Sequence, residues 1–176
     1  MPKKKEDYPN QSRWQALFRG SLLSTTMNKH VSYVGLADRR AQGIITINSI
    51  LIPLALSGSQ NPIFMNGALV AIATALLSIS TAIFSLYPKR YGHKNHAHRD
   101  LLHFSQIQRF SEERYLELMK EALEDTGLLA EMITQDLYHI SQRILHPKFF
   151  WLKISYFSFF IGNLIALLLI GLKALS

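Results

Sequence analysis

The chain has 176 residues, the usual length of one domain, and 48% of them are hydrophobic. It has no cysteine, which excludes disulfides, thiolate chemistry and a zinc site with cysteine ligands. Its formal net charge of +7 favours partners that carry negative charge. The apolar residues are gathered into three blocks without charged side chains, and this segregation predicts an integral membrane protein.

Residues 1–42 are predicted to form a cytoplasmic arm that contains a helix from Leu22 to Arg40. The segment carries eight basic and three acidic side chains, whereas the linker 57–61 carries none. Because short cytoplasmic flanks hold the excess of Lys and Arg, the N-terminus is expected inside the cell. Asp38, beside Arg39 and Arg40, is interpreted as a member of a structural ion pair. A catalytic group and a gate latch are the alternatives.

Residues 43–87 are predicted to form a transmembrane hairpin of two spans. The first block, Gly43 to Leu56, has fourteen residues, which is short for a bilayer, so a buried core helix is its alternative interpretation. The second block, Pro62 to Tyr87, has twenty-six residues without a charge and is long enough to cross with tilt.

The second span carries two stripes at helical spacing. Gly67, Ala71, Ala75 and Ala82 form a small-residue stripe that lets another helix approach closely. The hydroxyl stripe either lines a pore or packs against a neighbouring helix with its hydroxyls bonded to the helix's own carbonyls. A single chain of three helices encloses no channel, so a pore requires an oligomer. The pore interpretation assigns the lining to Asn48, Asn66, Thr74, Ser78, Thr81, Ser85 and Asn163.

Residues 88–148 are predicted to be a cytoplasmic helical region with nine basic and nine acidic side chains. Ser111 is a candidate N-cap ahead of Glu112 and Glu113, and Gly127 is expected to end or bend this helix. The apolar stripe expected on the first helix is Tyr115, Leu116, Met119 and Leu123. The stripe expected on the second is Leu129, Ile133, Leu137, Ile140 and Ile144, before Pro147.

The cytoplasmic charges have two interpretations. The first is the positive-inside rule with attraction to anionic lipid, and the second is a site for a phosphate-bearing nucleotide. A histidine cluster, His93, His96, His98 and His103, is interpreted as a solvated loop, with a metal site as the alternative. No nucleotide-binding loop, metalloprotease motif or nucleophile elbow occurs, so neither catalytic residues nor a cofactor nor a metal site is predicted.

Residues 149–176 are predicted to form the third transmembrane helix. Its core, Ile154 to Leu172, contains nineteen uncharged residues, and Lys148 and Lys153 flank its entrance. The C-terminus is therefore expected outside. The predicted fold class is all-α, with three transmembrane helices and a small cytoplasmic helical layer.

Several short motifs resemble the Pycsar effector domain. Residues 37–41 (ADRRA) lead into GIITINSIL as that family's Ala-Asp-x-Lys-Ala motif leads into its first span. The segments DLLHFSQIQRFSEERYLELMKEAL, DLYHISQRIL and KFFWLKISYFSFFIGNLI are similar to its later helices, so the likeness covers residues 37–172. Arg40 replaces the family's lysine, and the turn around His103 and Phe104 lacks its Phe-Phe-Gly-His pattern.

The resemblance implies a bacterial anti-phage effector that impairs the inner membrane when a nucleotide signal changes. The signal would be a nucleotide or short oligonucleotide made by a partner nucleotidyltransferase or cyclase. Related membrane effectors include the Hailong and SLATT-like types. Since no fused sensor domain is predicted, the helical layer itself would sense the signal.

The functional hypothesis is a homo-oligomeric channel, guessed to be a tetramer, that contacts membrane lipids and is gated by an anionic nucleotide. A non-channel scaffold or immunity subunit that binds another membrane protein is the alternative. Arginine is suited to phosphates because its fork binds them in bidentate fashion, and tyrosine rings stack on bases. The expected ligand contacts are Arg39, Arg40, Arg99, Arg109, Arg114, Arg143, Tyr115 and Tyr138.

Overall fold

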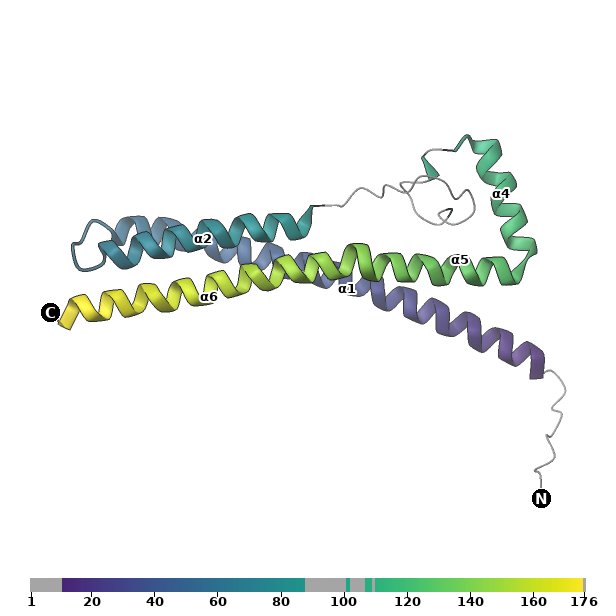
Figure 1. Cartoon of the computed structure of the whole chain (residues 1–176), viewed down its shortest axis with the longest axis horizontal. Coiled ribbons are helices and arrows are strands. Elements are labelled where there is room, and N and C mark those ends of the chain that lie inside the picture. The colour runs from purple at the N-terminus through teal and green to yellow at the C-terminus, as the bar shows by residue number, and fades with distance from the viewer. Residues whose placement is uncertain (1–10, 88–100, 102–106, 109, 176) are drawn as a thin grey trace, which may run out of the picture. The chain divides into compact units, whose positions relative to one another are not determined.

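The computed structural model describes residues 11–87, 101, 107–108 and 110–175, with side chains from residue 15 onward. The regular elements in these ranges are all helices (Figure 1). They are α1 (Gln11–Gly58), α2 (Met65–Leu86), α4 (Glu112–Glu124), α5 (Thr126–His139), a π-helix η1 (Ile140–Leu145) and α6 (His146–Leu175). The histidine cluster lies outside the described residues.

The chain divides into two compact units. The first, here called the helical layer, comprises Met1–Ser32 and Tyr91–His139. The second comprises Tyr33–Arg90 and Ile140–Ser176. Three helical stretches are long and apolar enough to cross a membrane, Gln15–Gly58, Met65–Leu86 and Thr126–Leu175. The chain is thus an all-α membrane protein with three such helices, and the second unit is called the membrane unit below.

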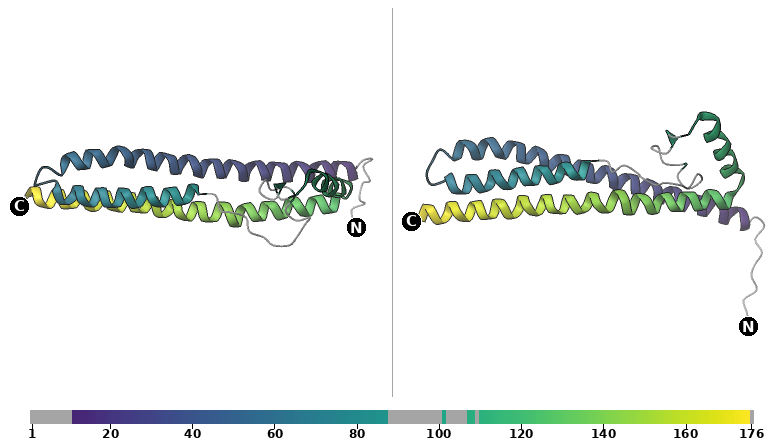
Figure 2. Two further views of the ribbon diagram at one scale, coloured as in Figure 1. Left: turned by 90° about the horizontal axis from the view of Figure 1, so that it is seen from above. Right: turned by 45° about the horizontal axis from the view of Figure 1, so that its top comes forward.

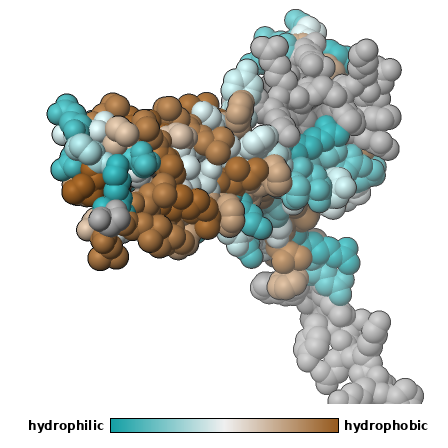
Figure 3. Space-filling model, turned by 60° about the vertical axis from the view of Figure 1, so that its left-hand side comes forward, coloured by the Kyte–Doolittle hydropathy of each residue, from teal (hydrophilic) through white to brown (hydrophobic). Residues whose placement is uncertain are grey.

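The membrane unit buries many small side chains and several polar ones, and it exposes many large apolar side chains. Its buried residues include Ala37, Ala41, Ala75 and Ala82, whereas Phe157 and Leu172 are 67% and 68% exposed. Figure 3 shows the apolar surface that such residues form on the face in view. In water this arrangement would be unfavourable, but in lipid the outer surface meets a solvent as apolar as itself. The packing therefore agrees with the membrane protein that the composition predicts.

Helix α1 runs without a break through the predicted boundary between residues 42 and 43. No sequence signal ends a helix there, and Pro53 is accommodated inside it, as membrane helices tolerate. Helix α2 begins at Met65, three residues after the predicted start at Pro62, and α6 begins at His146. Figures 1 and 2 show α2 and α6 side by side, with the second half of α1 along them.

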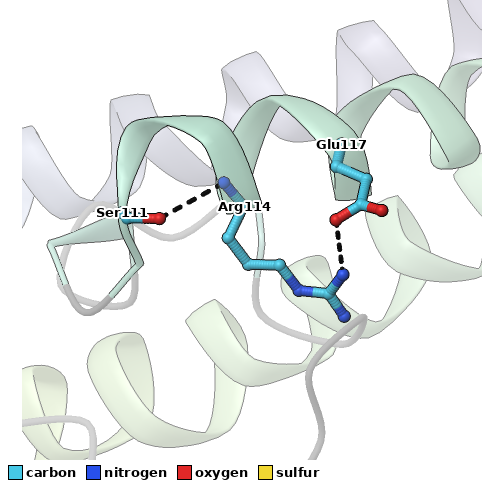
Figure 4. Close-up of polar contacts among 3 residues, drawn as sticks. All are labelled: Ser111, Arg114 and Glu117. Carbon is cyan, nitrogen blue, oxygen red and sulfur yellow. Dashed lines mark hydrogen bonds and ion pairs between the residues drawn. The ribbon is translucent and has the colours of Figure 1, made fainter.

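The helical layer has a core between α4 and α5. Leu101, Leu118, Ala122 and Met132 are buried together, and Tyr115 packs against them. Ser111 caps α4 as predicted, since its Oγ accepts from the backbone N–H of Arg114 at 3.4 Å (Figure 4). Glu112 and Glu113 occupy the first turn.

Two details of the helical layer differ from the sequence prediction. Leu116 and Leu123 are exposed, because Leu118 and Ala122 complete the buried face with Tyr115. Gly127 does not end the first helix. Asp125 does, because its Oδ1 accepts from the N–H groups of Gly127 (2.7 Å) and Leu128 (3.1 Å) and so starts α5.

Candidate functional site

A polar cluster joins the three helices inside the membrane unit. Asn48 of α1, Ser78 of α2 and Ser155 of α6 are each 0% exposed. The Asn48 Nδ2 donates to Ser78 Oγ at 3.1 Å, and Ser78 Oγ donates to the Ser155 carbonyl at 3.0 Å. In return, Ser155 Oγ donates to the Ser78 carbonyl at 2.7 Å. All three helices are therefore linked by hydrogen bonds at one level.

Asn48 has one oxygen that the cluster leaves without a partner. Its Nδ2 must be the nitrogen, because it also donates to the Ile44 carbonyl at 2.8 Å and a carbonyl only accepts. Its Oδ1 is buried and has no hydrogen-bond partner among the described residues. A buried polar atom without a partner is costly, and rare in folded proteins. Asn48 is thus the point in the cluster that a donor or water would stabilise.

Lys148 connects the same three helices at a second level. Its Nζ forms an ion pair with Asp38 of α1, and its backbone carbonyl accepts from Ser85 Oγ of α2 at 3.0 Å. The Lys148 side chain is 12% exposed and that of Asp38 34%. The ion pair interpretation of Asp38 agrees with this geometry, but the partner comes from α6 and not from the adjacent arginines.

The π-helix lies directly before this junction. Pro147 is the second residue of α6, lacks an N–H, and carries a ring that collides with the carbonyl four residues earlier in a regular helix. The wider turn at Ile140–Leu145 changes where those carbonyls point. The junction at Lys148 therefore sits next to an irregular turn, which is where helices bend.

Helices α2 and α6 approach closely where glycines replace side chains. A Cβ on Gly162 would lie 2.1 Å from Thr74 Oγ1, and one on Gly67 would lie 2.7 Å from the Ala166 carbonyl oxygen. Ala71 and Ala75 are also buried. The predicted small-residue stripe of α2 is confirmed as a helix-packing surface.

The residues predicted to line a pore lie in different environments. Ser78, Thr81 and Ser85 are buried, and Thr74 is half-buried against Gly162. Thr81 Oγ1 bonds the Leu77 carbonyl of its own helix at 2.9 Å. Asn66 is exposed, and half-buried Asn163 donates to the Phe159 carbonyl at 2.7 Å. The stripe of α2 faces neighbouring helices here, so its pore-lining role stays a prediction that requires these helices to separate.

The expected ligand contacts are divided between the two units. In the membrane unit Arg39 and Arg40 are exposed and Arg143 is half-buried. In the helical layer Arg114 is exposed and pairs with Glu117 at 2.6 Å, as Figure 4 shows. Tyr138 is 64% exposed, with its ring 6.1 Å from that of His139.

Two further expected ligand contacts, Arg99 and Arg109, lie outside the described residues. Tyr115 packs against the core of the helical layer, which leaves less of its ring for stacking. The ligand-contact set stays a prediction.

Sequence reasoning missed Ser155 and the Asp38–Lys148 pair. Ser155 lies in the third span, and its spacing of seven and eleven residues from Gly162 and Ala166 is the signal that places all three on one face. Nothing in the sequence pairs Asp38 with a lysine 110 positions later.

Comparison with known proteins identifies one family. A family model described as the Pycsar effector protein domain matches residues 22–174. No curated protein and no solved structure matches the chain.

Proposed function

Because this chain belongs to the Pycsar effector domain family, and is therefore a membrane effector of anti-phage defence, we propose that it acts as an oligomeric channel. The channel opens or closes in response to a nucleotide signal and impairs the inner membrane of the bacterium. Effectors of this family are regulated by cyclic nucleotides from a partner cyclase, which makes that class of signal the first candidate.

One observation carries the channel proposal: buried polar side chains join the three helices of the membrane unit at two levels. The Asn48, Ser78 and Ser155 cluster leaves an acceptor unsatisfied, and the apolar cluster of the membrane unit contains two alanines, Ala41 and Ala82, beside Ile44 and Leu152. Polar and ionisable side chains inside a membrane bundle mark substrate or ion pathways. Membrane helices that exchange partners are suited to gating.

The signal is proposed to bind the basic cytoplasmic side. Arg39 and Arg40 are exposed just before the uncharged block that begins at Gly43, and each is within two positions of Asp38 and Ala41 of the packed face. A phosphate bound there would add negative charge next to the Asp38–Lys148 pair and compete for its lysine. The proposed orientation, with the N-terminus cytoplasmic, is supported by the positive charge of residues 1–42.

The experiment is ion flux from potassium-loaded liposomes that contain the purified chain, measured with a panel of cyclic nucleotides and short oligonucleotides. We expect one compound to change the flux, and Arg39→Ala with Arg40→Ala to weaken that response. Lys120→Ala, an exposed cation of α4 outside the ligand set, is the matched control and should respond as the wild type does. Flux equal to that of empty liposomes under every condition would refute the channel and favour the scaffold role.

A further inference from the structure

Helix α1 carries a polar stripe on the face opposite the one that packs against α2 and α6. Its members recur at helical spacing and all of them are exposed. The stripe, called the outer stripe below, consists of Arg39, Gln42, Thr46, Ser49, Pro53 and Ser57, of which Pro53 alone is non-polar. It is a separate feature from the hydroxyl stripe of α2.

The outer stripe is opposite the packed face of α1. Two positions along a helix correspond to a turn of about 200°. Two positions after Gln42 comes Ile44, which is 2% exposed, and two positions after Thr46 comes Asn48, which is 0% exposed. The helices of the same chain cannot cover the outer stripe without releasing Asn48 from Ser78.

The other two membrane helices show what a lipid-facing surface looks like in this protein. From Gly67 to Leu86 the exposed residues are Leu69, Ala73, Leu76, Leu77, Ser80, Ile83 and Phe84. From Ile154 to Leu172 they are Tyr156, Phe157, Phe160, Leu164, Ile165, Leu167, Leu168, Gly171 and Leu172. Large apolar side chains dominate both surfaces. The exposed surface of α1 also includes Ile47, Ile50, Leu54 and Leu56, which flank the outer stripe, whereas the stripe itself contains no large apolar side chain.

The hydrogen bonds of the outer stripe argue against a surface that faces only lipid. Thr46 Oγ1 and Ser49 Oγ bond the carbonyls of Gln42 (3.0 Å) and Ile45 (2.9 Å), which hydroxyls do in any membrane helix. The side-chain amide of Gln42 is exposed and has no partner among the described residues. An amide requires protein or water beside it in a membrane.

The outer stripe is also nearly long enough to cross the hydrocarbon core of a membrane. Arg39 and Ser57 are 18 positions apart, which corresponds to about 27 Å at ~1.5 Å per residue and is close to the ~30 Å of the hydrocarbon core. Ser49, about 15 Å from Arg39, then lies near the middle of the bilayer. A local packing contact between helices does not need polar residues over the full thickness, but water does.

We propose that the outer stripe lines a water-filled path enclosed by copies of this chain. The occupant of this face is a second copy, because rotational symmetry turns the same face of every subunit toward one axis, and one stripe per chain then surrounds the water. This inference rests on the proposed channel function and assigns its lining to α1. Arg39 stands at the cytoplasmic mouth of this path.

The absence of cysteine makes the inference testable with single cysteines. Thr46→Cys and Ser49→Cys probe the outer stripe, Ile47→Cys at the same depth probes the lipid-facing side, and Ser78→Cys probes the buried cluster. Proteoliposomes of each variant are treated on both sides with a charged, membrane-impermeant methanethiosulfonate. Potassium flux is measured in the same samples before and after treatment. A bifunctional thiol crosslinker added to parallel samples tests whether copies face one another.

Thiols react as thiolates, which form in water, so Thr46→Cys and Ser49→Cys should react about ten-fold faster than Ile47→Cys. Their modification should change the flux, and the crosslinker should join two copies. Equal rates at Thr46→Cys and Ile47→Cys, or faster reaction at Ser78→Cys, would overturn the inference while leaving a measured flux intact. Crosslinked copies with unreactive thiols would indicate a dry helix seam and would also overturn it. Rapid reaction of Thr46→Cys and Ser49→Cys without flux in any sample would refute the channel, but it would still support contact between the outer stripe and water.

Discussion

Replacing Gly162 by alanine should destabilise the membrane unit, and the structure gives the size of the effect. The new Cβ would lie 2.1 Å, 2.3 Å and 2.6 Å from Oγ1, Cβ and Cγ2 of Thr74, so α2 and α6 must move apart. Overpacking of this kind costs about 1–3 kcal/mol. Gly171 is the matched control, because it lies in the same helix and a Cβ there meets nothing within 4 Å. Both changes gain the same helix propensity, about 1 kcal/mol, so the difference between them isolates the collision.

The assay is unfolding in mixed micelles by titration with SDS, followed by far-ultraviolet circular dichroism. Gly162→Ala should unfold at a lower SDS fraction than the wild type, and Gly171→Ala at an equal or higher one. Thr74→Gly contains none of the three colliding atoms, so Gly162→Ala should be far less harmful in that background. If Gly162→Ala is as stable as Gly171→Ala, the close approach of α2 and α6 described here is wrong.

Three further predictions concern individual contacts. A double-mutant cycle with Asn48→Ala and Ser78→Ala should give a coupling energy of about 0.6–2 kcal/mol in the same SDS assay, and additive effects would contradict the hydrogen bond between them. Asp38→Lys or Lys148→Asp alone should lower the midpoint, by an amount equivalent to about 1 kcal/mol, and the exchanged pair should recover most of it, whereas no recovery would show that the ion pair does not form. Asp125→Ala should destabilise the start of α5 by about 0.5–2 kcal/mol and speed hydrogen exchange at the Gly127 and Leu128 amides, and unchanged exchange would count against the cap.

The three membrane-spanning helices were predictable because a membrane requires long segments without charged residues, and such segments can be recognised in the sequence. The uncharged blocks at 43–56, 62–87 and 154–172 all lie in or overlap helices that are long and apolar enough to cross. The extent of α1 was not predictable in the same way. Composition changes at residue 42 while the backbone continues as one helix to Gly58, since a change of solvent does not end a helix.

The polar contacts of the candidate site were only half predictable. Periodicity within α2 places Ser78 and Ser85 on one face, yet it does not say which helix covers that face. Their partners are Ser155 and the Lys148 carbonyl of α6. These pairings depend on the register between α2 and α6, which the glycine contacts at 67 and 162 determine in three dimensions.

The buried face of the short helix α4 could not be predicted from the spacing of its apolar residues either. In α4 the expected stripe included Leu116, which is 57% exposed, and omitted Leu118, which is 1% exposed. Both leucines lie within one turn of Tyr115, so several overlapping stripes fit the spacing equally well. The contact with Met132 of α5 selects the stripe that contains Leu118.

The most direct test of the central claim is the recording of single-channel currents from the purified chain in a planar bilayer. Cyclic nucleotides are added to the side that holds the N-terminus. The account predicts discrete current steps whose open probability changes with one of the compounds, and whose amplitude changes when Thr46→Cys is modified. A bilayer that stays silent, or that leaks without discrete steps and without response to any nucleotide, would contradict a signal-gated channel.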